Sequence, residues 1–337
     1  MGSLEPGSES WLASVTEDIV EPGRPIIDTH HHLWEQPTPL WGRYVLQDLW
    51  RDTGCGHNVE KTVFIDCHSG YRSDGPDHLK PVGETQYVAG VAAESAAGEG
   101  KATIAGIVSH ADMTLDEGRL KEVLAAHEEA GQGLFRGIRH AGPSDDTGTL
   151  SNPGRRACPY GRDDFRAGVR TLGELGYTYD TWHFFMQNRE YLDLARSATG
   201  TTMILDHFGT PLGVGAYAGR QDEIFAQWRE DIAAIAQCPN VVAKLGGMAM
   251  PDNGFGWDQR ERPPSSDEFV SAQWPYYMHT IECFGPQRCM FESNFPVDRL
   301  SVSYQVLWNA FKKLVADFSE EEKHAMFYGT AERVYRL

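Results

Sequence analysis

The stretch Ile26-Ile27-Asp28-Thr29-His30-His31-His32-Leu33-Trp34 is the most informative part of the chain. Its apolar start and polar end predict a buried β-strand that finishes in a cluster of histidines. Because successive side chains of a strand point to opposite faces, His30 and His32 should point the same way. Two neutral imidazoles aimed in one direction are half of a divalent-metal site. For this pair alone, the alternative is a polar rim at the end of a strand.

Short apolar segments alternate with segments of helical periodicity along the rest of the chain. The predicted strands are Ile26–His32, Thr62–Cys67, Thr103–Ser109, Phe135–His140, Tyr179–Phe184, Met203–His207, Val241–Leu245 and Cys289–Asn294. The predicted helices include Leu120–Ala130, Asp163–Leu175, Arg189–Thr199, Ile224–Gln237 and Glu268–Phe284. This alternation predicts parallel strands with helical crossovers, and eight such strands predict a (β/α)8 barrel. A doubly wound open sheet is the alternative, but no G-x-G-x-x-G motif follows the first strand.

Composition and charge narrow the class of protein. The chain has 337 residues, of which 41% are hydrophobic and 23% charged, as in a globular protein. Its net charge of −18 argues against binding to nucleic acid or to an anionic membrane. No apolar run reaches the ~18 residues that a membrane-spanning helix needs. We therefore expect an acidic N-terminal arm over residues 1–24, without the features of a signal peptide, and a single barrel domain over residues 25–337.

The six cysteines and three long connections add two further expectations. The cysteines are scattered without a C-x-x-C pair, which predicts free thiols in a reducing cytoplasm. The connections Gly142–Arg162, Phe208–Asp222 and Gly246–Asp267 follow predicted strands and exceed the usual length. In a parallel barrel such loops lie on the C-terminal face, where chemistry is built, although any one of them can be a tolerated insertion.

Histidines stand at the ends of most predicted strands. They are His30, His32, His68, His110, His140, His183 and His207. Because the C-terminal ends of barrel strands converge, this placement predicts one polar pocket. A single metal needs only three or four ligands, so some of these histidines should support others or cap helices. We expect His110 and His140 to be the first of those.

Five motifs, taken in chain order, resemble those of the amidohydrolase-related metal-dependent hydrolases. The similarity is to the lactonase branch, which contains 2-pyrone-4,6-dicarboxylate lactonase and sugar-acid lactonases. It covers the chain from about Pro25 to the closing Tyr328–Tyr335 segment. The motifs are Asp28–Trp34, Gly137–His140, Ile204–Gly209, Lys244–Gly247 and Phe284–Pro296.

The resemblance implies a distorted TIM barrel of one domain, with His30, His32 and His207 as inward ligands or polarising groups. One divalent metal is expected there, and imidazole-rich ligation favours Zn²⁺. Metal-independent action stays open, because close relatives can differ in this requirement. The family carries a water-activating carboxylate on strand eight, but here the aligned residue is Asn294, whose amide cannot accept a proton. We hypothesise that Glu292, on the same face, supplies the missing carboxylate; a salt bridge in the barrel floor is the alternative.

Several further residues are expected to bind substrate. Arg139 resembles the family's arginine for a substrate carboxylate, because its guanidinium matches a carboxylate in a bidentate pair. His68, His183 and Gln187 should also contact substrate, and Arg72 is a lesser candidate that a surface ion pair would explain equally well.

The leading functional prediction is hydrolysis of a lactone of a small carboxylated acid or sugar acid. A bound cation or the histidines would polarise the ring carbonyl for attack by water. The alternatives are a decarboxylase or hydratase on the same scaffold, and a catalytically impaired barrel that only binds a small molecule. The expected partner is an anionic small molecule, with neither nucleic acid nor membrane, and a homo-oligomer is left open.

Overall fold

The computed structural model describes residues 4–150 and 158–337. Residues 1–3 of the predicted arm and 151–157 of the loop Gly142–Arg162 lie outside the described residues. Eight parallel strands form one sheet in chain order, which confirms the predicted distorted TIM barrel of a single domain. They are β1 (Pro25–His31), β4 (Asn58–Ile65), β5 (Thr103–Ser109), β6 (Phe135–Arg139), β7 (Thr178–Thr181), β8 (Met203–Leu205), β9 (Val241–Leu245) and β10 (Cys289–Phe291).

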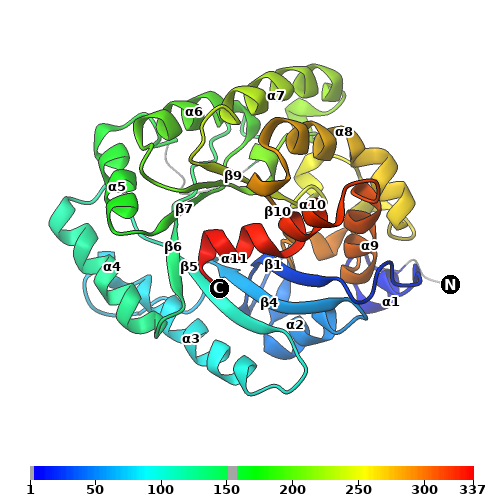
Figure 1. Cartoon of the computed structure of the whole chain (residues 1–337), viewed down its shortest axis with the longest axis horizontal. Helices are drawn as coiled ribbons and strands as arrows, with labels where there is room; N and C mark the ends of the chain where they lie inside the picture. Colours follow the sequence, from blue (N-terminus) through cyan, green and yellow to red (C-terminus); the bar gives the residue numbers. More distant parts are fainter. Residues whose placement is uncertain (1–3, 151–157) are drawn as a thin grey trace.

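Most of the helices surround this barrel on the outside, whereas the last of them, α11 (Thr330–Tyr335), lies within the ring in Figure 1. In chain order the helices are α1 (Glu9–Leu12), α2 (Leu46–Thr53), α3 (Val82–Ala96), α4 (Glu117–Gly131), α5 (Asp163–Glu174), α6 (Asn188–Ser197), α7 (Gln221–Ile235), α8 (Ser266–Phe284), α9 (Tyr304–Leu314), α10 (Glu320–His324) and α11 (Thr330–Tyr335). A hairpin of β2 (Trp34–Thr38) and β3 (Gly42–Tyr44) follows β1. Because the crossover helices bury their apolar sides against the strands, most of the core lies between these two layers.

The barrel is distorted where its first and last strands meet. In the described chain, β1 and β10 share no ladder; the residues after β10 close the gap instead. The backbone N–H of Asn294 donates to the carbonyl of His30 at 2.9 Å, and the N–H of His32 donates to the carbonyl of Phe295 at 2.8 Å. This seam therefore fixes the His30–His32 segment against the segment that follows β10.

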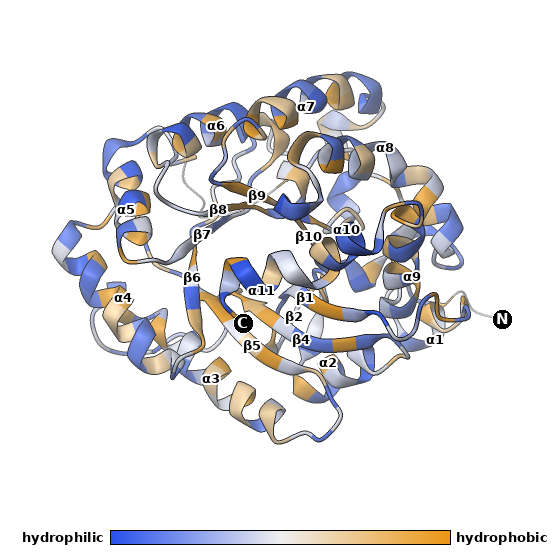
Figure 2. Ribbon diagram, in the orientation of Figure 1, coloured by the Kyte–Doolittle hydropathy of each residue, from blue (hydrophilic) through white to orange (hydrophobic). Residues whose placement is uncertain are grey.

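Helix α11 lies at the centre of the ring in Figure 1 and fills one end of the barrel. Its residues Ala331, Val334 and Tyr335 form one buried cluster with inward-facing residues of the strands, such as Ile27 and Met290. Figure 2 shows the hydrophobic colour running along the barrel strands β1, β4 and β5. The polar group formed by His30, His207 and Glu292 lies instead near the ends of β1, β8 and β10.

Several predicted strands end earlier than the sequence pattern indicated. The bounds of β5 and β9 match the prediction, but β8 stops before His207 and β10 stops before Asn294. The reason is backbone conformation, because His207 has φ 52° and Asn294 has φ 55°, in the left-handed region. Helices α2 and α3 and the β2–β3 hairpin were not predicted.

Residues 4–24 pack along α8 and α9 of the same chain. The buried indole of Trp11 donates to the carbonyl of Arg260 at 3.0 Å. Glu17 accepts from the backbone N–H of Ser266 at 2.7 Å, at the beginning of α8. Lys312 of α9 donates to the carbonyl of Val20 at 2.9 Å. The described part of the arm is therefore held by polar contacts as well as by an apolar anchor.

Two simple predictions can be compared with the structure. All six cysteines are free thiols, as expected from their spacing. Two of them, Cys238 and Cys289, are buried. Within residues 4–150 and 158–337, no helix has the length and apolar character needed to cross a membrane.

Candidate active site

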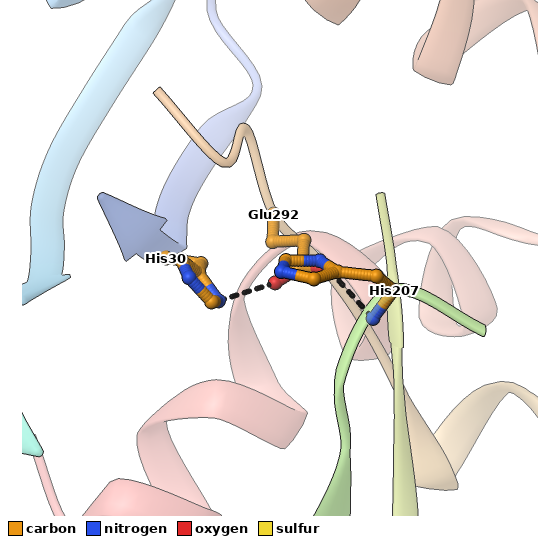
Figure 3. Close-up of side chains that lie close together, drawn as sticks. All are labelled: His30, His207 and Glu292. Carbon is orange, nitrogen blue, oxygen red and sulfur yellow. Dashed lines mark hydrogen bonds and ion pairs between the residues drawn. The ribbon is translucent and has the colours of Figure 1, made fainter. Parts of the chain in front are cut away.

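Two histidines and one glutamate meet where β1, β8 and β10 end. His30 lies at the end of β1, His207 follows β8 and Glu292 follows β10, and all three are buried. Oε2 of Glu292 lies 2.8 Å from Nδ1 of His30, and Oε1 lies 2.6 Å from Nδ1 of His207, as Figure 3 shows. One potential ligand atom from each residue lies within 4.8 Å of the others. The barrel therefore brings together residues that lie far apart in sequence, since His30 and Glu292 are separated by 262 positions.

Two glycines after β9 make room for this group. A Cβ atom on Gly246 would lie 2.5 Å from Cγ of Glu292. A Cβ atom on Gly247 would lie 2.1 Å from Nδ1 of His207, and Gly247 also has φ +70°. Only glycine at these two positions allows Glu292 and His207 to approach so closely. The two glycines of the Lys244–Gly247 motif thus contribute to the site by leaving space for Glu292 and His207.

His32 faces His30, as the H-x-H spacing predicts. Their Nε2 atoms are 3.2 Å apart. Nδ1 of His32 donates to the carbonyl of Ile65 at 2.9 Å, which leaves Nε2 with the lone pair. Burial lowers the pKa of both imidazoles well below the usual value, and the nearby cations Lys244 and Arg139 lower it further. Both rings are therefore neutral near pH 7, the state in which imidazole binds a metal.

A buried lysine lies directly beneath these rings. Nζ of Lys244 is 3.0 Å from Oδ1 of Asp206, 3.1 Å from Oδ2 of Asp180 and 3.2 Å from Nδ1 of His30. Burial alone would lower the pKa of Lys244, but Asp206, Asp180 and Glu292 outweigh it and hold the pKa above the usual value. Lys244 therefore stays charged inside the barrel.

Arg139, at the end of β6, forms the other buried ion pair. Its Nε donates to Oδ1 of Asp66 at 2.5 Å, and its Nη2 donates to the Asp66 carbonyl. Its Nη1 lies 3.3 Å from Nε2 of His30 and 3.7 Å from Oδ2 of Asp206. Burial would lower the pKa of Arg139, but the two aspartates outweigh it, so the pKa is raised. One edge of the guanidinium is thus occupied by Asp66, and Nη1 faces the histidines.

His68 stands at the exposed side of the same aspartate. Its Nδ1 lies 3.3 Å from Oδ2 of Asp66, while 64% of its side chain is exposed. Its backbone has φ 63°, and its ring stacks on Tyr71. The hydrogen bond to Asp66 raises the pKa of His68, an effect that partial burial opposes. His68 therefore offers its Nε2 to solvent in an orientation that Asp66 fixes.

Comparison with known proteins assigns the chain to a family. The sequence profile of the amidohydrolase family matches residues 27–337. The chain belongs to the amidohydrolase family. The uncharacterized protein y4mH of Sinorhizobium fredii is 30% identical over 334 residues, which cover 93% of this chain and 98% of that protein.

A second relative and one solved structure carry more descriptive names. The L-fucono-1,5-lactonase of Burkholderia multivorans is 28% identical over 325 residues, covering 92% of this chain and 96% of that enzyme. A crystal structure of an amidohydrolase from Burkholderia multivorans with bound zinc has a TM-score of 0.71 at 24% identity. It covers 93% of this chain and 99% of its own, and this likeness concerns the fold.

Two residues expected to contact substrate in this amidohydrolase are engaged elsewhere. His183 is fully buried; its Nε2 lies 2.9 Å from Oδ1 of Asn188 and its ring packs on Tyr191. Gln187 donates to the carbonyl of Ser144 at 2.9 Å and so ties two loops together. Both lie beyond the end of β7 at Thr181, so the alternation expected of a strand does not direct them inward. Substrate contact by these two residues stays a prediction, and the contacts seen here give each of them a structural role.

Arg72 and Asn294 also depart from expectation. Arg72 lies exposed in the loop after β4, where its backbone N–H donates to the carbonyl of Lys80 at 3.0 Å. Nδ2 of Asn294 donates to Oδ1 of Asp298 at 2.8 Å. Because β10 ends at Phe291, Asn294 and Glu292 are not alternate residues of one strand, and their side chains have different partners. The shared face expected from sequence is thus not found.

Sequence reasoning missed the aspartates of the site. Asp66, Asp180 and Asp206 are buried near the ends of β4, β7 and β8. A usable signal was present, because an acidic residue at the end of an apolar strand is as informative as a histidine there.

The residues of the amidohydrolase site suit a divalent cation. The buried carboxylates Asp66, Asp180, Asp206 and Glu292 face two cations, Lys244 and Arg139, which leaves an excess of two negative charges. Burial raises the pKa of Asp206 to about 6, partly offset by Lys244, so this carboxyl is mostly ionised at pH 7. Neutral imidazoles and a carboxylate are ligands that Zn²⁺ accepts. Donor chemistry and local charge therefore both fit a metal.

Proposed function

We propose that this amidohydrolase hydrolyses the ring ester of a lactone derived from a small sugar acid or carboxylated acid. The observation that carries the proposal is the group formed by His30, His207 and Glu292 at the C-terminal end of the barrel strands. Family membership and the 28% identity to an L-fucono-1,5-lactonase support the same reaction class. Active sites of TIM barrels lie at this end of the strands.

We propose that three histidines hold one divalent metal, with zinc the expected ion. His30 and His32 would bind it through Nε2, and His207 is the third ligand. When bound, the ion supplies a Lewis acid that polarises the ester carbonyl and lowers the pKa of a water. Nδ1 of His32 bonds to the carbonyl of Ile65, and Nδ1 of His207 bonds to Glu292. Neither of these contacts uses the Nε2 atom of its ring. Such outer contacts fix the tautomer and orientation of metal-binding histidines.

The chain's own residues handle the proton. We assign to His68 the role of general base, in which its Nε2 takes the proton of the attacking water, because this ring is exposed and is oriented by Asp66. The water oxygen bonds to the ester carbon as its proton passes to Nε2 of His68, the ring C–O bond breaks, and the released alkoxide takes up that proton from His68. This differs from a strand-eight carboxylate, since Asn294 cannot accept the proton. Nη1 of Arg139, directed at His30, stabilises negative charge that develops beside the imidazole.

Decarboxylation of an unsaturated or aromatic acid is the second candidate. It is favoured by one observation, the amide of Asn294 where the family resemblance places a water-activating carboxylate. A decarboxylase needs to deliver a proton to carbon rather than to remove one from water, so this substitution would do no harm.

The test is a substrate panel with the purified protein before and after metal removal by a chelator. Neutral sugar-acid lactones, including L-fucono-1,5-lactone, and carboxylated lactones such as 2-pyrone-4,6-dicarboxylate would be followed by acid release at constant pH. Aromatic and unsaturated acids would be followed by carbon dioxide release. We expect ring opening of at least one lactone, lost in the His30→Ala/His32→Ala variant. It should be kept in Asp52→Asn, which alters a half-buried carboxylate that accepts a hydrogen bond from Tyr44 outside the site. Carbon dioxide release without lactone opening would favour the decarboxylase.

A further inference from the structure

Glu292 has an unusual combination of contacts for a carboxylate beside a reaction site. Its Oε1 accepts two bonds from one residue, from Nδ1 of His207 at 2.6 Å and from the backbone N–H of His207 at 3.2 Å. Its Oε2 lies 2.8 Å from Nδ1 of His30 and 3.9 Å from Nζ of Lys244. The side chain has no exposed surface. Oε1 is thus an acceptor of two N–H groups, whereas Oε2 lies beside His30 and Lys244 without a hydrogen-bond partner of its own among the described residues.

These contacts argue against the general-base role considered from sequence. A general base needs a lone pair directed at the water whose proton it takes. The oxygen closest to His207 is already an acceptor of two N–H groups, and the other oxygen is enclosed by His30 and Lys244. What the contacts do instead is decide the state of His207. Because a carboxylate accepts but does not donate, the neutral ring of His207 carries its hydrogen on Nδ1 and its lone pair on Nε2.

We propose that Glu292 is a positioning residue that locks His207 in the tautomer with a free Nε2 lone pair. The inference rests on the proposed function only in taking His207 as a residue of the reaction site. Glu292 accepts hydrogen bonds from both the ring and the backbone N–H of His207. The φ of His207 is 52°, in the left-handed region. It therefore holds both the imidazole and the turn from which the imidazole projects. The absence of side chains at Gly246 and Gly247 is what lets the carboxylate reach this place.

The role predicts a particular order among substitutions at Glu292. Glutamine keeps a carbonyl oxygen at the position of Oε1, which can still accept from both N–H groups of His207. Alanine removes the acceptor, so the ring of His207 can rotate and exchange tautomers. A positioning residue is thus rescued by Glu292→Gln and lost in Glu292→Ala. A general base fails in both, because an amide does not take up a proton.

The experiment compares Glu292→Gln, Glu292→Ala and the control Asp52→Asn in protein labelled with ¹⁵N at histidine and freed of metal. The ¹⁵N shifts of His207 report its tautomer without any substrate. We expect a single Nδ1–H tautomer in wild type, Asp52→Asn and Glu292→Gln, and a mixture in Glu292→Ala. Zinc affinity, measured by competition with a chelator, should fall about 10- to 100-fold in Glu292→Ala, the usual loss for an outer contact of a ligand histidine.

Turnover at saturating zinc separates the two roles if a substrate is found. The positioning role predicts that Glu292→Gln keeps kcat within about tenfold of wild type, whereas a general base predicts a loss of ~10²-fold or more. An unchanged His207 tautomer and zinc affinity in Glu292→Ala would overturn the proposal. If Glu292→Ala does not fold, a kcat loss of ~10²-fold in Glu292→Gln with intact tautomer would overturn it as well. Failure of the proposed lactonase activity would leave the tautomer and zinc measurements unaffected.

Discussion

Replacing Lys244 by methionine should destabilise the protein in a way that its buried partners determine. The ammonium lies 3.0 Å from Asp206 and 3.1 Å from Asp180, and none of the three side chains is exposed. Removing one partner of a buried ion pair costs about 3–5 kcal/mol, because the remaining charge is left without compensation. With about 2.1 cal/mol/K of unfolding entropy per residue and 337 residues, this loss lowers the melting temperature by about 4–7 °C.

The stability lost in Lys244→Met should depend on pH, and the pKa of Asp206 decides in which direction. Burial already raises the pKa of Asp206 to about 6, and Lys244 opposes that rise. Without the lysine, the folded pKa moves further above the unfolded value of about 4. A carboxyl with a raised folded pKa destabilises the protein as pH increases through that range, so the loss should be larger at pH 8 than at pH 5.

Melting curves at pH 5 and pH 8 would check this, with Lys61→Met as the control. The Lys61 ammonium lies 4.0 Å from a partly exposed Glu332, a pair worth less than about 1 kcal/mol. Adding Asp206→Asn to Lys244→Met should recover part of the stability. A Lys244→Met variant that melts within 2 °C of wild type at pH 8 (roughly 1.4 kcal/mol) would refute the reasoning.

Three further changes test other parts of the site. Gly247→Ala should displace His207, since the added Cβ would lie 2.1 Å from its Nδ1; we expect loss of zinc binding in a folded protein, checked by elemental analysis and circular dichroism. Arg139→Ala removes the buried cationic partner of Asp66 and leaves it only the exposed His68, so thermal melting should reveal a loss of about 3–5 kcal/mol, whereas a change confined to KM would favour substrate binding by Arg139. His68→Gln should remove the acidic limb of kcat/KM, which in wild type is shifted upward from the ordinary value because the bond to Asp66 raises the pKa of His68; a limb that persists would assign it to another group.

The barrel was predictable because its signal is repeated along the chain. Each apolar strand followed by an amphipathic helix points to the same architecture, so an error in one segment does not change the result. Strand β5 was predicted to the residue. The hairpin of β2 and β3 was not, since its residues, such as Glu35 and Thr38, are mostly exposed and carry no periodic apolar pattern.

The site was predicted less completely, for reasons of backbone geometry. His30 and His32 face each other because the alternation of β1 still governs their direction. Alternation could not place Asn294, which stands in the left-handed region beyond its strand. Nor could the sequence reveal that the partner of Arg139 is Asp66, since the two are 73 positions apart and meet only across β5.

Helix α11, which fills one end of the barrel, is also the last helix to be synthesised, so a newly made chain completes its site only when α11 is in place. The Tyr335 hydroxyl of α11 donates to Oδ2 of Asp180 at 2.5 Å, on the carboxylate that also pairs with Lys244. Every strand leaves the ribosome before this hydroxyl does, because α11 follows β10 in the chain. Until then the buried aspartate has Thr178 and Lys244 as partners but lacks the Tyr335 hydroxyl, and α11 does not yet cover the apolar lining of the strand interior. Synthesis that stops before α11 should therefore yield a sheet that chaperones retain rather than an enzyme of reduced activity.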